Sequence, residues 1–210
     1  MSASNVSVEF LFDFGSPNVY LAHLLVPGIE ARTGVRFRYL PTLLGGVFKL
    51  TGNVSPVISM QGVKNKPEYQ ALEMKRFVRD HEIESFKMNP HFPVNTLQIM
   101  RGAIVAERLG VLERYVDEVL RYMWSEPRKM DDPEVIREAL SESGLDADAI
   151  LEGTQDSDVK ARLIANTEDA VSRGVFGAPS FFVGDELFFG KDRLDDVERE
   201  ILRQAREAGA

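Results

Sequence analysis

Apolar residues near the two ends of the chain follow the spacing of β-strands. Residues 6–12 (VSVEFLF) alternate and then become wholly apolar, which is typical of a strand that enters a buried sheet. Residues 35–40 (VRFRYL) alternate cleanly and predict a second strand. Towards the C-terminus, PSFFVG and ELFFG flank the turn dipeptide Gly184-Asp185 and predict a hairpin. We therefore expect strands at both ends of the chain.

Helical spacing dominates the rest of the sequence. Ser16 can cap a helix whose first position is Pro17, where a missing N–H costs nothing. The resulting β-α-β order requires a crossover and favours parallel pairing of the first two strands. An amphipathic helix follows the C-terminal hairpin. The pattern predicts an α/β domain, formed by residues 1–42 and 174–210, that is interrupted by an all-helical insertion domain of residues 43–173.

One part of the insertion lacks a helical pattern. Residues 45–67 are rich in Gly, Asn, Pro and Ser, which predicts a loop. Such a long connection is more often functional than a simple linker. We therefore expect this segment to act as a lid over a site.

Charge and hydropathy limit the possible partners. The chain has 33 acidic and 25 basic residues, a formal net charge of −8, and its basic residues form no separate patch. Nucleic acid is therefore not expected as a partner, because the phosphate backbone would be repelled. No apolar run approaches the roughly 20 residues of a membrane-spanning helix, and the N-terminus lacks the pattern of a secretory signal. A cytoplasmic location with no membrane contact is expected.

Several classes of chemistry are excluded by residues that the chain lacks. The sequence contains no cysteine, which excludes disulfides, CxxC redox motifs and cysteine nucleophiles. Thiol chemistry would therefore need a sulfur from another molecule. The three histidines have no metal-ligand spacing, so no metal is expected. A P-loop and a GxGxxG motif are also absent, and Ser16 lies in DFGSPN rather than in a GxSxG elbow.

Three local features remain as candidates for a site. Ser16 follows a buried strand at a helix start, so its hydroxyl and the nearby N–H groups could hold a thiolate; the alternative is a plain N-cap. Ala178-Pro179 precedes a strand, where a cis bond would leave the Ala178 backbone free to pair with an extended peptide; the alternative is a proline that opens an edge strand. Asp192, within FFGKDR, can cap the last helix or hold an ammonium group.

The order of these features resembles a known family. A strand, a capping serine where a redox cysteine would sit, a helical insertion and a terminal ββα unit are similar to a thioredoxin fold. More closely, FDFGSPNVYLA, LGGVFKLTGN, KPEY, HFPVNT and FGAPSFFVGDELFFGKDR resemble 2-hydroxychromene-2-carboxylate isomerases and kappa-class glutathione transferases over nearly the whole chain. The resemblance implies a DsbA-like thioredoxin fold interrupted by helices, glutathione as cofactor, and a homodimer.

The same resemblance assigns roles to individual residues. It implies that Ser16 hydrogen-bonds the glutathione sulfur and keeps it ionised. Residues expected to bind glutathione are Ala178, which pairs with the cysteinyl backbone, Phe189, Gly190, Lys191 and Asp192 at the γ-glutamyl end, and Asn53. Residues expected to line the substrate site are Lys49, Tyr69 and Asn95. The isomerase pattern would place a tyrosine in the segment HFPVNT, and this sequence has none there.

The implied function is a glutathione-dependent isomerase in the catabolism of aromatic compounds. A thiolate would add reversibly to 2-hydroxychromene-2-carboxylate or a similar aromatic pyruvate, allow rotation about the resulting single bond, and leave unchanged. A free thiol has a pKa near 8.5, so lowering it by one or two units raises the thiolate fraction up to roughly tenfold. Two alternatives stay open, namely a kappa-class-like transferase that releases the adduct, and a non-catalytic thioredoxin-like module that binds peptides.

Overall fold

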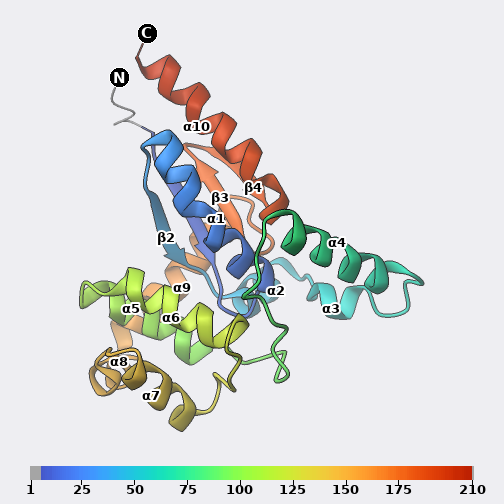
Figure 1. Cartoon of the computed structure of the whole chain (residues 1–210). Coiled ribbons are helices and arrows are strands. Elements are labelled where there is room, and N and C mark those ends of the chain that lie inside the picture. The colour runs from blue at the N-terminus through green and yellow to red at the C-terminus, as the bar shows by residue number, and fades with distance from the viewer. Residues whose placement is uncertain (1–5, 210) are drawn as a thin grey trace.

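A mixed sheet of four strands forms the centre of the computed structural model, which describes residues 6–209 (Figure 1). The strands are β1 (Val8–Phe12), β2 (Phe37–Pro41), β3 (Ser180–Val183) and β4 (Glu186–Phe189), in the order β2-β1-β3-β4. β1 is parallel to β2 and antiparallel to β3, which is in turn antiparallel to β4. The predicted strands, hairpin and parallel first pair are confirmed, and the protein is of the α/β class.

Helices account for most other residues. They are α1 (Pro17–Thr33), α2 (Leu44–Thr51), α3 (Pro56–Ser59), α4 (Lys66–Asp80), α5 (Leu97–Arg108), α6 (Leu112–Trp124), α7 (Pro133–Glu142), α8 (Ala147–Gly153), α9 (Ser157–Ser172) and α10 (Leu194–Ala208), with a 3₁₀ turn η1 (Lys191–Arg193) before α10. Every element described between β2 and β3 is a helix. Among the described helices, none is long and apolar enough to cross a membrane.

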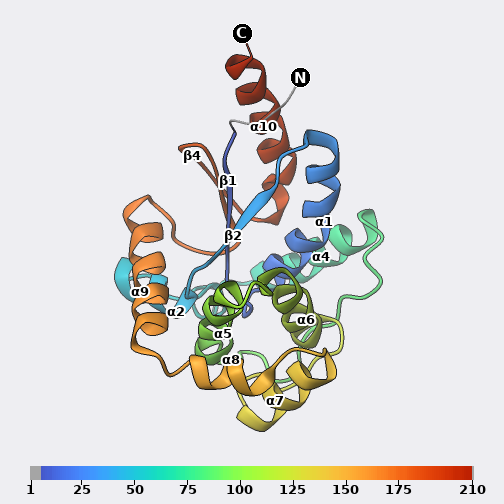
Figure 2. The same cartoon turned by 90° about the vertical axis from the view of Figure 1, so that its left-hand side faces the viewer.

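Both faces of the sheet are buried under helices. Alternating side chains of β1 explain this, because Phe10 and Phe12 enter one apolar cluster and Leu11, between them, enters another. Phe10 stacks on Phe181 of β3, with ring centroids 4.8 Å apart. In the edge-on view of Figure 2, α1 and α10 lie on one side of the sheet and α9 on the other, with α5 to α8 beneath it. The sheet is therefore a rigid support for the loops at its ends.

The prediction of a loop over residues 45–67 is wrong in part. Residues 44–51 form α2 and residues 56–59 form α3. Two glycines near the start of α2 weaken the helical pattern in the sequence, but Gly46 is needed by the packing of α2 on α9. A Cβ atom at this position would lie 2.9 Å from Cγ2 of Thr167. Long-range packing therefore overrides local propensity here.

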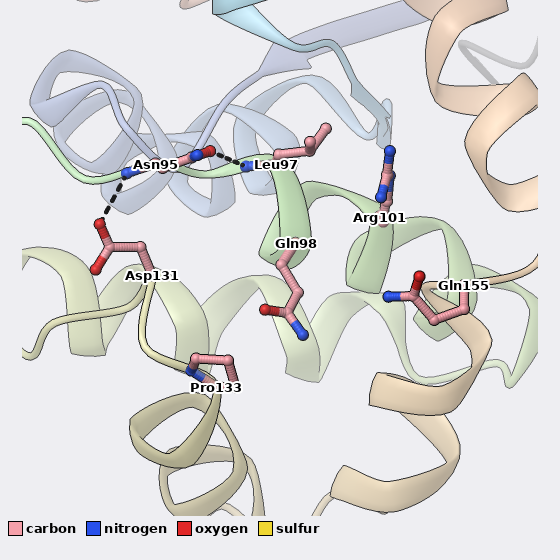
Figure 3. Close-up of a pocket in the computed structure, with 7 residues that line it drawn as sticks. All are labelled: Asn95, Leu97, Gln98, Arg101, Asp131, Pro133 and Gln155. Atoms are coloured by element: carbon pink, nitrogen blue, oxygen red, sulfur yellow. Dashed lines mark hydrogen bonds between the residues drawn. The ribbon is translucent and has the colours of Figure 1, made fainter.

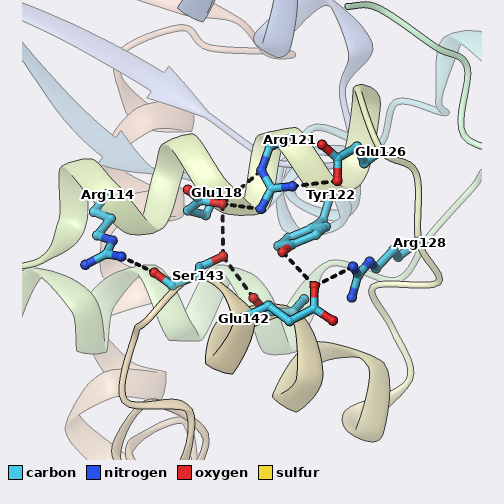
Figure 4. A network of polar contacts seen from close by, with 9 residues as sticks. Arg114, Glu118, Arg121, Tyr122, Glu126, Arg128, Glu142 and Ser143 are labelled. Atoms are coloured by element: carbon cyan, nitrogen blue, oxygen red, sulfur yellow. Dashed lines mark hydrogen bonds and ion pairs between the residues drawn. The ribbon is translucent and has the colours of Figure 1, made fainter.

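A polar network stabilises the helices beneath the sheet (Figure 4). Two guanidinium groups lie over the Tyr122 ring on α6, with Arg121 at 4.0 Å and Arg128 at 4.3 Å from its centroid. Arg121 pairs with Glu118, Arg128 pairs with Glu142 at 2.6 Å, and the Tyr122 hydroxyl donates to Glu142. The network joins α6 to α7, and because its charges are paired we interpret it as structural.

An ion-pair cluster on the sheet leads to a testable pH dependence. Burial raises the pKa of Glu9 on β1, but hydrogen bonds from Arg38 and Arg173 outweigh burial and hold that pKa below its usual value. A carboxyl whose pKa is lower in the folded state contributes stability above its unfolded pKa and loses it as the pH falls through the folded value. Glu9→Gln should therefore lower the free energy of unfolding by about 1 kcal/mol at neutral pH.

Urea unfolding at several pH values checks this expectation. The difference between Glu9→Gln and the unchanged protein should vanish once the pH lies below the folded pKa of Glu9. Glu113→Gln serves as a control, because its ion pair with Arg36 is exposed on both sides and should contribute less. A difference between Glu9→Gln and the unchanged protein that is independent of pH would contradict the expectation.

Candidate functional site

Ser16 lies where β1 ends and α1 begins. Its side chain makes no capping hydrogen bond, although the residue has the extended backbone of an N-cap. The hydroxyl instead donates to the carbonyl oxygen of Ala178 at 3.0 Å, across 162 residues of sequence. The alternative of a plain side-chain cap is therefore wrong, and the serine is joined to the proline-bearing loop. Ser16 is largely buried, and it adjoins the positive end of the α1 dipole.

The loop before β3 supplies the second part of the site. The Ala178–Pro179 peptide bond is cis, as the sequence interpretation required. Within residues 6–209, the backbone N–H of Ala178 has no hydrogen-bond partner. The carbonyl of Pro179 accepts the Gly190 N–H at 2.9 Å, and Ser180 pairs with Phe189 across the hairpin. Ala178 and Pro179 thus lie next to Phe189 and Gly190, and together these residues form one continuous edge of backbone.

That segment differs from the sequence expectation at Asp192. Residues 191–193 form the 3₁₀ turn η1, and Asp192 caps neither this turn nor α10. Nζ of Lys191 lies 2.5 Å from the Asp192 carboxylate. The second interpretation, in which Asp192 holds the ammonium group of a ligand, stays a prediction. Lys191 is buried, and its Nζ also lies 4.2 Å from the ring centroid of Phe77 on α4. Gly190 has φ 100°, a conformation that favours glycine.

The remaining predicted residues are exposed and lie on other elements. Lys49 is on α2, Asn53 follows α2, and Tyr69 is on α4. A chain of hydrogen bonds, strand pairs and sequence neighbours joins Ser16, Ala178, Phe189, Gly190, Lys191 and Asp192. Within the described chain, Lys49, Asn53 and Tyr69 make no hydrogen bond to Ser16 or Ala178.

Asn95 faces a separate hollow of about 390 Å³ (Figure 3). The other residues that line it are Leu97, Gln98, Arg101, Asp131, Pro133 and Gln155. The side-chain oxygen of Asn95 accepts the Leu97 N–H at 3.1 Å, and the backbone N–H of Asn95 donates to the Asp131 carboxylate at 3.4 Å. Asn95 thus lies two residues before α5, accepts the first N–H of that helix, and makes no hydrogen bond to Ser16. Its neighbour Thr96 is closer to the serine loop, since a Cβ atom at Gly15 would lie 3.1 Å from Cγ2 of Thr96.

Two buried residues near Ser16, Asp13 and Thr96, were missed from the sequence. Asp13 is fully buried and accepts hydrogen bonds from Gly15 N–H and Leu44 N–H, each at 2.8 Å. Burial raises its pKa, while these two bonds and the Thr96 side chain act in the opposite direction. An acidic residue directly after a buried strand, in FDFGSP, was the available signal. Among the described residues, no group of three or more His, Cys, Asp and Glu side chains could hold a metal ion.

Comparisons with known proteins extend this description. The family model described as "DSBA-like thioredoxin domain" matches residues 7–202. A 2-hydroxychromene-2-carboxylate isomerase of Sphingobium xenophagum is 29% identical over 196 residues, covering 93% of this chain and 98% of the relative. Glutathione S-transferase kappa 1 of Caenorhabditis elegans is 26% identical, with 94% and 91% covered. A solved 2-hydroxychromene-2-carboxylate isomerase superposes with a TM-score of 0.82 at 27% identity, covering 96% of this chain and 97% of that one.

Proposed function

The chain belongs to the family of DSBA-like thioredoxin domains, and we propose that it is a glutathione-dependent isomerase. The thioredoxin-like fold and the resemblance to 2-hydroxychromene-2-carboxylate isomerases and kappa-class transferases, both expected from the sequence, are confirmed. The proposed substrate is 2-hydroxychromene-2-carboxylate or a similar aromatic pyruvate. One observation carries the proposal: the Ser16 hydroxyl lies 3.0 Å from the carbonyl of Ala178, whose N–H is unpaired within the described chain.

The residues at this edge fit glutathione. Ala178 offers one carbonyl and one N–H, which are the two groups that an extended peptide needs for strand-like pairing. Ser16 offers a hydroxyl beside a helix N-terminus, where a negative charge is favoured. The chain contains no cysteine, so a thiol must come with the ligand. When bound, glutathione supplies a thiolate nucleophile for reversible addition to a conjugated double bond.

The contact between Ser16 and Ala178 suggests how the hydroxyl becomes available. A hydroxyl has one proton to donate, and the Ser16 proton is directed at the Ala178 carbonyl. An N–H of a bound peptide would take this place on the carbonyl and release the Ser16 hydroxyl. The hydroxyl would then donate to the sulfur, and the N-terminus of α1 would stabilise the negative charge of that thiolate. Binding and ionisation would thus be coupled at one residue.

The segment after β4 is proposed to hold the γ-glutamyl end. The Asp192 carboxylate is 70% exposed, so it can accept an ammonium group in addition to that of Lys191. Phe189 and Gly190 continue the edge from Pro179, and Asn53 is proposed as a further glutathione contact. We assign Lys49 to the substrate carboxylate or developing enolate charge, and Tyr69 and Asn95 to the substrate side.

The fate of glutathione tests the proposed reaction. In an isomerisation, glutathione at a small fraction of the substrate concentration should support complete conversion, and titration of free thiol should show no loss. The measurement is the substrate absorbance followed together with the thiol content. Loss of one thiol per turnover would instead favour the transferase alternative, which the kappa-class relative supports. Calorimetry that detects no binding at millimolar glutathione would reject both and favour the peptide-binding module.

A further inference from the structure

One buried carboxylate joins two segments around Ser16. The two oxygens of Asp13 accept N–H groups of different segments: Oδ1 bonds Gly15, in the serine loop, and Oδ2 bonds Leu44, the first residue of α2. The side chain of Thr96, immediately before α5, adjoins the serine loop and helps to lower the pKa of this carboxyl. The backbone carbonyl of Asp13 also accepts the Ser16 N–H at 3.1 Å. The serine loop and α2 are thus fixed to a single side chain, and the start of α5 lies beside the same loop.

The chemistry of this junction requires a carboxylate. Asp13 is 1% exposed, and the polar groups around it are N–H groups and a hydroxyl. Among the described residues, Asp13 has no ion-pair partner. An ionised carboxylate accepts hydrogen bonds at both oxygens, whereas an asparagine accepts at one atom and donates at the other. In Asp13→Asn, an NH₂ group would therefore face the N–H of either Gly15 or Leu44. The substitution keeps the size of the side chain and removes one of its two hydrogen bonds to backbone N–H groups.

We propose that Asp13 is the positioning residue of the glutathione site, acting through Ser16. It sets where the Ser16 hydroxyl stands relative to Ala178, and it holds α2, which carries Lys49, beside the same loop. The inference rests on the proposed function. The peptide backbone of the ligand is assigned to Ala178 and to residues 189–192, and no hydrogen bond of the described chain joins Asp13 to them. Asp13 should therefore control the ionisation of the bound thiol more than the affinity for glutathione.

The test compares the pKa of the bound thiol, the dissociation constant and kcat in a set of variants. The thiol pKa is read from the ultraviolet absorbance of the thiolate in the enzyme–glutathione complex as the pH is varied. Asp13→Asn should raise this pKa by about 0.5 to 1 unit and lower kcat about threefold to tenfold at neutral pH. The dissociation constant for glutathione should change less than about twofold. The double variant Ser16→Ala with Asp13→Asn should be no worse than Ser16→Ala alone.

Two further variants separate positioning from charge and from stability. Thr96→Val removes a hydroxyl beside the serine loop and no charge, and it should move the thiol pKa in the same direction by a smaller amount. It also keeps the proposal testable if Asp13→Asn does not fold. Asn89→Ala removes another buried polar junction, whose side chain donates to the Met123 and Arg128 carbonyls at 3.0 Å, and it should destabilise the protein without shifting the thiol pKa.

The outcomes distinguish this inference from the proposed function. If the unchanged protein does not bind glutathione as a thiolate, the proposed function fails. If it does, and both Asp13→Asn and Thr96→Val leave the thiol pKa and kcat unchanged, only the positioning role is overturned. A lower thiol pKa in Asp13→Asn would also overturn it, because removing a nearby negative charge favours the thiolate whereas misplacing Ser16 disfavours it.

Discussion

Ser16→Ala is expected to lower kcat about tenfold to a hundredfold at neutral pH, with glutathione affinity changed only a few-fold. The hydroxyl is the proposed donor to the sulfur, and losing a donor aimed at a developing or fixed anion removes stabilisation that water cannot restore in a buried position. The thiol should then titrate nearer its free pKa of about 8.5, so that only a few per cent is ionised at neutral pH. Steady-state kinetics and the ultraviolet absorbance of the bound thiolate measure the two effects.

The chain offers a matched control for this variant. Ser180 is also buried in the proline-bearing segment, and its hydroxyl donates to the carbonyl of Gly177 at 2.8 Å. Ser180→Ala removes a hydroxyl of the same kind a few residues from Ala178, and it should leave the thiol pKa unchanged. Equal losses of kcat in the two variants, or an unaltered thiol pKa in Ser16→Ala, would contradict the assigned role of Ser16.

Strong local periodicity explains the parts of the fold that the sequence predicted. Phe10, Leu11 and Phe12 alternate between two buried faces, and this pattern has few interpretations other than a central strand. The hairpin is equally local, because its turn and both strands lie within ten residues. The bond from Ser16 to Ala178 is different, since 162 residues separate them and no periodicity encodes their contact. Only the order of motifs shared with a known family indicated that they meet.

Long-range packing also explains what could not be predicted. The helix α2 depends on Gly46 fitting against Thr167, a residue more than a hundred positions away. Asp192 pairs with its neighbour Lys191 instead of capping α10, because the 3₁₀ turn places α10 one residue later. The role of Asp13 becomes visible only in the folded chain, where its carboxylate accepts the first N–H of α2 and where Thr96 affects its pKa. Each case involves partners that no local window of sequence contains.

Trp124→Ala is expected to lower the free energy of unfolding by about 3–5 kcal/mol, because a fully buried indole at the end of α6 would be replaced by a cavity. The indole packs against Phe86 and Phe92, with ring centroids 6.5 and 6.0 Å away. Its Nε1–H donates to the carbonyl of Phe14 at 2.8 Å, two residues before Ser16. Urea unfolding monitored by far-ultraviolet circular dichroism measures the loss.

A second variant separates the cavity from the hydrogen bond. Trp124→Phe retains most of the ring and leaves the Phe14 carbonyl unpaired, which should cost about 1–3 kcal/mol. Leu109→Ala is the control, since this side chain is half exposed at the end of α5 and should change stability by less than about 1 kcal/mol. A cost for Trp124→Ala no larger than that for Leu109→Ala would contradict the expectation. Because Trp124 bonds to the serine loop, the helices beneath the sheet and the proposed site should lose stability together.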